Sequence, residues 1–188
     1  FANLVCGLGA IYSLLNPTLL AKTDRYLIAF LLVFLGQFFD LFDGRLARRF
    51  GSTRHGAVFD DVADATSFGI AISVLIVARL GINTATVTLA LFYLFCVIFR
   101  LIRFLRETGQ LDPGIFSRLP APAGALFAGS SLLLFAETGP LAWTMVIAAG
   151  ILMISRIRYR HFARRIWPEL PNILKVSAFV LILIFVNN

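Results

Sequence analysis

Long uninterrupted apolar blocks are the feature that most limits what this chain can fold into. Examples are LIAFLLVFLG at 27–36 and GIAISVLIVA at 69–78, and each belongs to a block of about 18 or more residues, the length of a helix that spans a bilayer. A membrane barrel instead needs segments in which apolar and polar residues alternate. Hydrophobic residues make up 59% of the chain and charged residues 14%, against roughly 45–50% and 25% in a soluble domain. We therefore predict an all-α, polytopic integral membrane helical bundle.

The apolar blocks predict seven membrane helices, at 1–20, 27–49, 56–79, 84–107, 117–136, 140–157 and 170–187. The connections are short, so we expect one compact bundle and a single membrane domain over 1–188. The chain begins with Phe1 rather than Met and ends within an apolar run, which leads us to expect a piece of a longer protein, trimmed at both ends. Cys6 and Cys96 lie in apolar runs without CxxC pairing, and we predict that both are free, buried thiols.

Basic residues divide unequally between the two sides of the membrane that these crossings predict. One side receives 14 of the 17 Lys and Arg residues, and the other receives Lys22, Arg25 and Arg79. Because cytoplasmic loops are enriched in Lys and Arg, the first side is predicted to face the cytoplasm, and we expect a prokaryotic cytoplasmic membrane. The net charge of +7 then reflects this topology and attraction to anionic lipid headgroups, and we predict no nucleic-acid partner.

Five of the ten acidic residues lie in one 25-residue stretch, DLFDGRLARRFGSTRHGAVFDDVAD at 40–64. Two pairs of these aspartates, three and four residues apart, each share one helix face: Asp40 with Asp43, and Asp60 with Asp64. A helical hairpin that turns near 51–52 brings the two pairs level, a turn or two inside the predicted cytoplasmic surface. Asp61 points about 100° away from Asp60, so we expect it to be solvated or paired with an arginine rather than to act with the other four.

Four carboxylates that face one another at membrane depth need a compensating partner. An isolated charge there costs roughly 2.5–3.5 kcal/mol on insertion scales, and mutual repulsion adds to that. Hard divalent ions prefer carboxylate oxygen, and two such ions with bridging ligands fit four carboxylates on two helices. Ion pairs with Arg45, Arg48 and Arg49 are the structural alternative. Such pairs could account for two or three aspartates, but they do not explain why four converge on one point.

Small residues accompany the carboxylates on these helix faces. Gly44, Ala47 and Gly56 either leave room for a ligand near the backbone or allow close helix packing. With the aspartates they form the pattern Asp40-x2-Asp43-Gly44-x2-Ala47-Arg48-x7-Gly56-x3-Asp60-x3-Asp64. All eight fixed positions, in this order, resemble the signature of the CDP-alcohol phosphotransferase family.

Further segments resemble one branch of that family, the membrane-embedded phosphatidylserine synthases. They run from the first expected helix to the sixth: ANLVCGLGAI at 2–11, DDVADATSFG at 60–69, RLIRF at 100–104, FSRLPAPAGA at 116–125 and LMISRIRYRHF at 152–162. Two residues depart from the pattern of the branch, and neither belongs to the eight-position signature. Arg118 stands in place of a glycine, and Asp61 stands in place of a small polar residue.

The resemblance implies that the hydroxyl of L-serine attacks the lipid-side phosphorus of CDP-diacylglycerol, giving phosphatidylserine and CMP. It implies two divalent cations, Mg²⁺ or Mn²⁺, held by Asp40, Asp43, Asp60 and Asp64, with Asp64 also the general base. It further implies a homodimer, and contacts to CDP-diacylglycerol by Asn3, Gly44, Ala47, Arg48 and Gly56. Asn3 could instead hydrogen-bond across helices. Because serine is a zwitterion, its carboxylate needs a cation, and the candidates are Arg100, Arg103 and Arg118.

Other functions stay open at this point. A member of the same family could use glycerol phosphate, inositol phosphate or choline as acceptor, because the signature is common to all of them. A divalent-cation or proton transporter would also place aspartates inside the membrane. The segments 27–36 and 69–78 carry no charge, however, which favours a catalyst at one membrane surface over a conduit. A non-catalytic scaffold leaves the four carboxylates unexplained.

Overall fold

A computed structural model describes residues 1–16, 22–50, 54–107, 115–116, 120–138, 140–155 and 159–160. Only the backbone is described at 22–23, 41–50, 54–55, 57–58, 104–107, 115–116, 138 and 159–160. The elements in chain order are α1 (Ala2–Leu15), α2 (Lys22–Phe50), α3 (Arg54–Asp64), the π-helix η1 (Ala65–Ile70), α4 (Ala71–Leu80), α5 (Thr84–Glu107), β1 (Ile115–Phe116), α6 (Ala121–Phe135), the 3₁₀-helix η2 (Ala136–Thr138), α7 (Pro140–Ile154) and β2 (Tyr159–Arg160). The two short strands pair antiparallel. The described residues are otherwise helical, as the apolar blocks predict.

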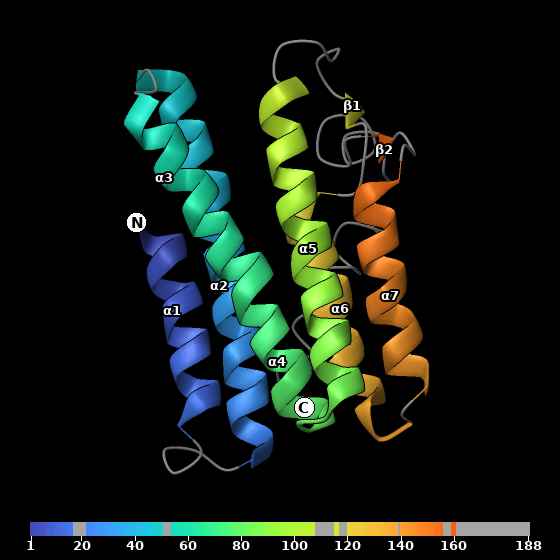
Figure 1. Ribbon diagram of the computed structural model, residues 1–188. Coiled ribbons are helices and arrows are strands. Elements are labelled where there is room, and N and C mark those ends of the chain that lie inside the picture. Colours follow the sequence, from blue (N-terminus) through green and yellow to red (C-terminus); the bar gives the residue numbers. More distant parts are fainter. Residues whose placement is uncertain are drawn as a thin grey trace, which may run out of the picture.

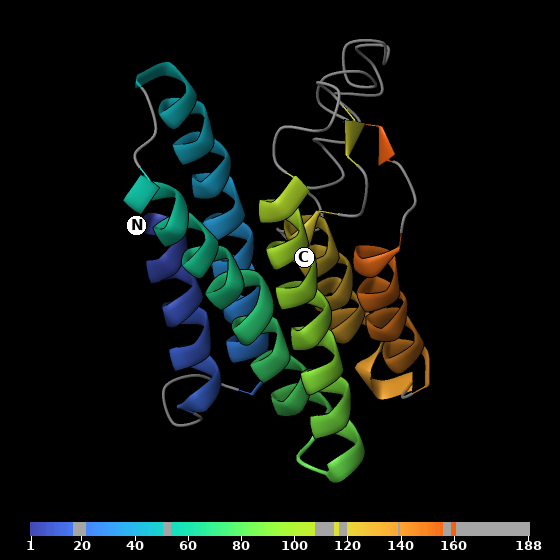
Figure 2. The same cartoon turned by 45° about the horizontal axis from the view of Figure 1, so that its top comes forward.

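The helices pack side by side along nearly one direction (Figures 1 and 2). Helix α1 lies against α2, α5 lies between α4 and α7, and α6 packs on α7. The segments α3, η1 and α4 follow one another without a break from Arg54 to Leu80. In Figure 1 the end of α2 and the beginning of α3 lie beyond the start of α1, which is marked N. The predicted hairpin of two helices around 51–53 is therefore present, although 51–53 themselves lie outside the described residues.

The turn between α4 and α5 shows how local sequence sets the helix boundaries. Gly81 follows the last residue of α4 with φ of 86° and ψ of 157°, a backbone conformation that essentially only glycine adopts without strain. Asn83 accepts a hydrogen bond from the backbone N–H of Thr86 at its Oδ1, at 2.8 Å, and thereby caps the first turn of α5. The predicted break between 79 and 84 is confirmed.

Small residues let the helices approach closely in the interior. A Cβ atom on Gly129 of α6 would lie 2.5 Å from the ring of Phe30 on α2, and one on Gly150 of α7 would lie 2.9 Å from the ring of Phe92 on α5. Small residues at helix contacts are typical of membrane bundles, in which close packing rather than the hydrophobic effect holds helices together. Cys6 and Cys96 are free and buried, as predicted.

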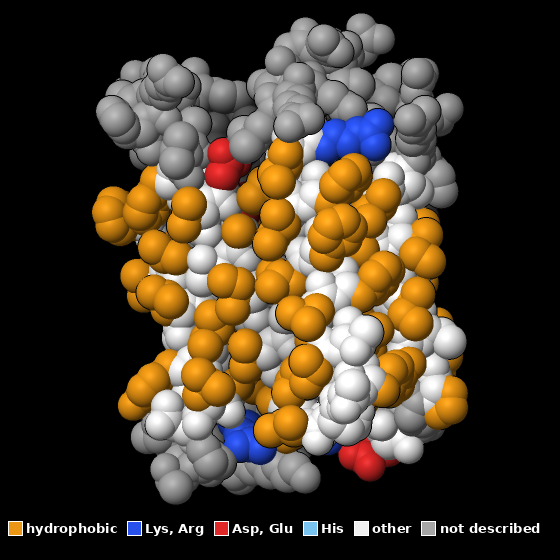
Figure 3. All heavy atoms as spheres, viewed as in Figure 1, with side chains coloured by type: hydrophobic (Ala, Val, Ile, Leu, Met, Phe, Trp, Pro, Cys, Tyr) orange, Lys and Arg blue, Asp and Glu red, His pale blue; other side chains and the backbone are white. Residues whose placement is uncertain are grey.

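Two helical segments among the described residues are long and apolar enough to cross a membrane, Phe59–Leu80 and Thr84–Arg103. Three shorter apolar helices accompany them: Ala2–Leu15, Ala121–Phe135 and Pro140–Ile154. On the face shown in Figure 3, hydrophobic side chains form a belt, and the coloured charged side chains gather near its two ends. A bundle that exposes an apolar belt between charged ends is the expected form of a helical membrane protein.

The helix boundaries agree with the sequence prediction in part. Helix α1 ends five residues before position 20, and α2 begins at Lys22 rather than at 27. The predicted seventh helix, 170–187, lies outside the described residues, so the count of seven spans stays a prediction. The expected helix over 56–79 is present as one continuous helical segment, in which the π-helix η1 directly follows Asp64. Its wide turn is visible in the backbone, where the N–H of Ala71 donates to the carbonyl of Thr66, five residues earlier.

Candidate active site

Charged groups from three helices lie near Asp64, the last residue of α3. Asp40 of α2, Asp60 one turn earlier on α3, and Arg100 of α5 all act electrostatically on the Asp64 carboxyl group. The hairpin geometry places Asp40 level with Asp64, and the four-residue spacing places Asp60 on the same face. Asp40, Asp60 and the candidate Arg100 thus lie near enough to Asp64 to interact with it electrostatically.

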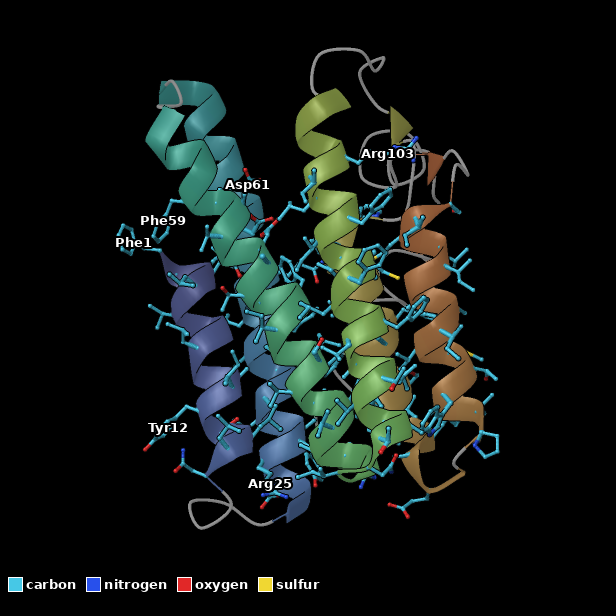
Figure 4. The ribbon with its side chains drawn as sticks, in the orientation of Figure 1. Phe1, Tyr12, Arg25, Phe59, Asp61 and Arg103 are labelled. Atoms are coloured by element: carbon cyan, nitrogen blue, oxygen red, sulfur yellow. The ribbon has the colours of Figure 1, made fainter. Side chains whose placement is uncertain are left out.

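The carboxylates differ in their access to solvent. Asp40 and Asp64 are half-buried, whereas Asp60 is exposed. Asp61, which we expected to stand apart, is half-buried and interacts electrostatically with Asp60. In Figure 4 it lies on α3 near the end of the bundle that also carries Arg103, while Arg25 lies at the opposite end. The site therefore combines partly desolvated carboxylates with an open side.

Helix α1 contributes a direct contact to this cluster. The side-chain amide of Asn3 donates a hydrogen bond from Nδ2 to Oδ1 of Asp64, at 3.0 Å. The cross-helix hydrogen bond that the sequence left open for Asn3 is therefore present, and its acceptor is a candidate catalytic residue. Next to it the ring of Phe1 packs on the ring of Phe59, with centroids 4.5 Å apart, and Figure 4 shows the pair where α1 begins.

The π-helix that follows Asp64 is fixed by side chains on both of its flanks. Ser67 donates from Oγ to the backbone carbonyl of Asn3 at 2.9 Å, and the buried hydroxyl of Tyr93 on α5 donates to the carbonyl of Phe68 at 3.2 Å. Segments of π-helix frequently occur at functional sites. Sequence reasoning missed η1, because the partners in these two hydrogen bonds, Asn3 and Tyr93, are distant in the sequence.

The candidate arginines lie on one face of α5. Arg100 and Arg103 are three residues apart, which places them on the same side of the helix, and both are half-buried. They stand at the end of the bundle that carries the aspartates, whereas Arg25 and Arg79 stand at the other end (Figure 4 labels Arg103 and Arg25). For these arginines the division between the two sides agrees with the one drawn from the sequence.

Several predicted site residues cannot be placed by their side chains. The backbone of α2 carries them, but the side chains are outside the described part of the chain: Asp43, Gly44, Ala47 and Arg48. Arg118 lies outside the described residues altogether. Gly56 is exposed on the first turn of α3, four residues before Asp60 and therefore on the same helix face. Their predicted roles remain predictions.

The donor chemistry at the cluster fits a hard divalent cation. The described acidic side chains that act on one another, Asp40, Asp60 and Asp64, offer only carboxylate oxygens, the ligands that Mg²⁺ and Mn²⁺ prefer, and a cation would relieve their repulsion. Within the described part of the chain, no group of three or more acidic, His or Cys side chains is close enough to hold a metal ion. The fourth predicted ligand, Asp43, is not among the side chains described.

An apolar groove of about 580 Å³ lies away from this cluster. Its lining runs from Leu14 on α1 across Val74 on α4 to Leu91 on α5, and includes Arg25. Arg25 belongs to the end of the bundle opposite the aspartates (Figure 4), and the described lining contains no carboxylate. The groove therefore offers contact to lipid or protein, and it contributes no group to the chemistry around Asp64.

The amino-acid sequence of the chain matches a known protein family. The family model of the CDP-alcohol phosphatidyltransferases matches residues 1–157. The chain belongs to this family. The matched range contains all eight positions of the pattern from Asp40 to Asp64. Members of the family are transferases and generally depend on a divalent cation.

Curated relatives cover most of the chain. The chain is 32% identical over 177 residues to a Helicobacter pylori protein, with 89% of this chain and 72% of the relative covered. It is 33% identical over 167 residues to a Bacillus subtilis protein, covering 86% and 87%, and 34% identical over 140 residues to a Methanocaldococcus jannaschii protein, covering 74% and 67%. All three relatives are named CDP-diacylglycerol–serine O-phosphatidyltransferase.

Proposed function

We propose that this protein transfers the phosphatidyl group of CDP-diacylglycerol to the hydroxyl of L-serine, giving phosphatidylserine and CMP. The observation that carries the proposal is the match to the family over residues that include the signature, in which Asp40 and Asp60 interact electrostatically with Asp64. The names of the relatives support serine as the acceptor. The lipid tails of the donor stay in the bilayer, so its pyrophosphate lies at headgroup depth, where the hairpin of α2 and α3 holds its carboxylates.

Asp64 acts as the general base in this proposal. It takes the proton of the serine hydroxyl as the serine oxygen bonds to the lipid-side phosphorus, and the bond from that phosphorus to the CMP oxygen breaks. A carboxylate serves as base when the alcohol is already polarised and positioned. The half-buried position of Asp64 excludes part of the water that would otherwise compete with serine as the nucleophile.

The four signature aspartates would hold two divalent cations, Mg²⁺ or Mn²⁺: Asp40, Asp43, Asp60 and Asp64. When bound, such ions screen the charge of the pyrophosphate and stabilise the departing phosphate. Gly44, Ala47, Arg48 and Gly56 would contact CDP-diacylglycerol, with the two glycines and the alanine leaving the helix backbone open to the ligand. The family resemblance also implies that Asn3 contacts CDP-diacylglycerol.

The serine carboxylate would bind to arginine on α5. Arg100 is the strongest candidate because it already acts electrostatically on Asp64, so a serine held by it would have its hydroxyl near the base. Arg103 lies one turn further along the same face, and Arg118 is the third candidate. The remaining basic residues serve membrane topology and contacts to lipid phosphate.

The location that fits this reaction is a prokaryotic cytoplasmic membrane, with the active site facing the cytoplasm. Arg100 and Arg103 lie at the end of the bundle that carries the aspartates, in keeping with enrichment of basic residues on the cytoplasmic side. Bacterial relatives support a prokaryotic source. We further propose a single membrane domain over 1–188 with seven spans, assembled as a homodimer, for which light scattering in detergent should give twice the chain mass of 20.8 kDa.

Release of CMP from CDP-diacylglycerol tests the proposed reaction. Purified protein should release CMP with serine and Mn²⁺, and should release far less without a divalent cation. Glycerol phosphate, inositol phosphate and choline serve as matched acceptors under the same conditions. CMP release with one of these and none with serine would show that the acceptor is wrong but the family chemistry right. Uptake of Mn²⁺ into protein-containing vesicles, with no CMP release by any alcohol, would favour the transporter instead.

A further inference from the structure

The side chain of Asn3 is enclosed at the edge of the candidate active site. It lies in the first turn of α1 and is only 2% exposed. Its amide donates to Oδ1 of Asp64 at 3.0 Å. A buried amide that donates a hydrogen bond to a candidate catalytic carboxylate can influence the reaction by orienting that carboxylate.

Two further contacts hold the start of α1 on the segment that follows Asp64. Ser67 donates from Oγ to the backbone carbonyl of Asn3 at 2.9 Å. A Cβ atom on Gly7, one turn further along α1, would lie 2.9 Å from the Cα of Ser67, so the two backbones are nearly in contact there. The amide of Asn3 therefore keeps a fixed position relative to Asp64.

The other side of the Asn3 amide faces protein. Its Oδ1 is buried and has no hydrogen-bond partner among the described residues. It lies 2.8 Å from the position that a Cβ on Gly36 of α2 would take. With Nδ2 engaged by Asp64 and Oδ1 enclosed against α2, the amide has no polar atom directed at open space. This arrangement differs from the direct contact with CDP-diacylglycerol that the family resemblance implies for Asn3.

We propose that Asn3 is a positioning residue for Asp64, and that it acts through this carboxylate and not by touching the substrate. Its hydrogen bond occupies one oxygen of Asp64 and fixes the rotation of the carboxylate, which leaves the second oxygen for the site shared with Asp40 and Asp60. The inference rests on the proposed function, because the role of Asp64 is itself part of that proposal. Groups that orient a metal-binding or catalytic side chain in this way typically contribute about 10–100-fold in metal affinity or activity.

The substitution Asn3→Ala tests the inference by two readouts. We expect kcat for CMP release to fall about 10–100-fold, with the KM for CDP-diacylglycerol within about twofold of the wild-type value. Titration of the purified protein with Mn²⁺, followed by the electron paramagnetic resonance signal of the free ion, should show weaker binding by a similar factor. The second readout needs no turnover, so it is independent of the identity of the acceptor alcohol.

Matched variants separate positioning from general damage to α1. Ser13 is buried on the same helix and donates only to the carbonyl of Ala10, at 2.8 Å, so Ser13→Ala should leave kcat and Mn²⁺ affinity unchanged. Ser67→Ala keeps the amide–carboxylate bond and removes only the anchor on the Asn3 backbone, so it should give a smaller loss in the same two quantities. If Asn3→Ala does not fold, Ser67→Ala carries the test by itself.

Three results would overturn the inference. The first is a rise in the KM for CDP-diacylglycerol with kcat unchanged, which would make Asn3 a substrate contact. The second is wild-type kcat and Mn²⁺ affinity in Asn3→Ala, and the third is unchanged values in Ser67→Ala where Asn3→Ala fails to fold. Failure of the proposed function looks different, because the wild-type protein itself would then release no CMP with serine, whatever Asn3 does to Mn²⁺ binding.

Discussion

At the scale of single residues, the site is governed by like charges held close together in a partly desolvated place. Asp40 and Asp64 come from different helices, are half-buried, and act on each other electrostatically. Such an arrangement is unfavourable by itself, because each charge loses hydration and gains repulsion. The proposed binding of divalent cations next to a pyrophosphate would explain it, because that chemistry needs concentrated negative charge.

Replacement of Asp64 by asparagine should remove most of the activity. Asparagine keeps the size of the side chain but loses both the charge and the basic oxygen, and a positioned general base is typically worth about 10²–10⁴-fold in rate. The measurement is kcat for CMP release with serine and Mn²⁺. Asp24 is an exposed aspartate at the other end of α2, and Asp24→Asn should keep wild-type activity. Turnover of Asp64→Asn within threefold of wild type would exclude Asp64 as the base.

The proposed role of Arg100 predicts a specific change in substrate affinity. Arg100→Gln removes a charge-assisted hydrogen bond to the serine carboxylate, a loss of about 1.5–3 kcal/mol, and the KM for serine should rise about 10–100-fold. The KM for CDP-diacylglycerol should change much less. Steady-state kinetics with each substrate varied in turn make the comparison. An equal rise in both constants would point to disturbance of the whole site in place of a serine contact.

At the scale of elements, the decisive feature is the contact between α1 and the π-helix η1. The wider turn of η1 begins directly after Asp64 and is fixed on one side by Ser67, which donates to Asn3, and on the other by Tyr93, which donates to Phe68. A side chain added between α1 and η1 would push these elements apart. The position of Asp64 therefore depends on close packing one helix away.

Two glycines of α1 allow this dependence to be tested. A Cβ atom on Gly7 would clash with Ser67, whereas one on Gly9 would meet only Leu32 Cδ1 at an ordinary 3.5 Å. Gly7→Ala should lower the apparent melting temperature in detergent, because overpacking typically destabilises by about 1–3 kcal/mol, and should also reduce kcat. Gly9→Ala should do neither, since both substitutions gain equally in helix propensity. Equal behaviour of the two variants would contradict the proposed role of this contact.

Sequence alone predicts the helices and the facing aspartates because both follow from simple periodicities. Apolar blocks mark the spans, and three- and four-residue spacings place Asp40 and Asp64 on facing sides of a hairpin. The π-helix could not be predicted, because it arises from hydrogen bonds to partners 64 and 25 positions away along the chain. The acceptor of the Asn3 hydrogen bond could not be predicted for the same reason. Asp64 is 61 positions away in the sequence, and only tertiary packing brings the two residues together.

At the scale of the whole molecule, the distribution of charge is the basis for the proposed orientation of the bundle in a membrane. Large hydrophobic side chains lie exposed along the flanks of the helices, and Figure 3 shows them as a belt between charged ends. At the end away from the aspartates, Arg79 pairs with Glu137 at 3.2 Å, and the hydroxyl of Tyr26 donates to the carbonyl of Ala78 at 2.8 Å. These contacts join α2, α4 and the segment after α6 at that end of the bundle, and the proposed chemistry belongs to the other end.

This orientation predicts which engineered cysteines are reachable from outside the cell. Cys6 and Cys96 are buried, so they should give little background labelling. A membrane-impermeant maleimide should label Ile82→Cys in intact cells, because Ile82 is 87% exposed in the turn between α4 and α5. It should label Ser52→Cys, in the turn that the sequence predicts between the two pairs of aspartates, only after the membrane is permeabilised. The reverse pattern would place the active site on the outer surface.

The central claim is that the signature aspartates of α2 and α3 surround divalent cations. Anomalous diffraction from crystals grown with Mn²⁺, at a concentration that supports CMP release, tests it most directly. We predict anomalous peaks between the carboxylates of Asp40, Asp43, Asp60 and Asp64. An anomalous map without a peak among these side chains, with the carboxylates turned away from one another, would contradict the claim.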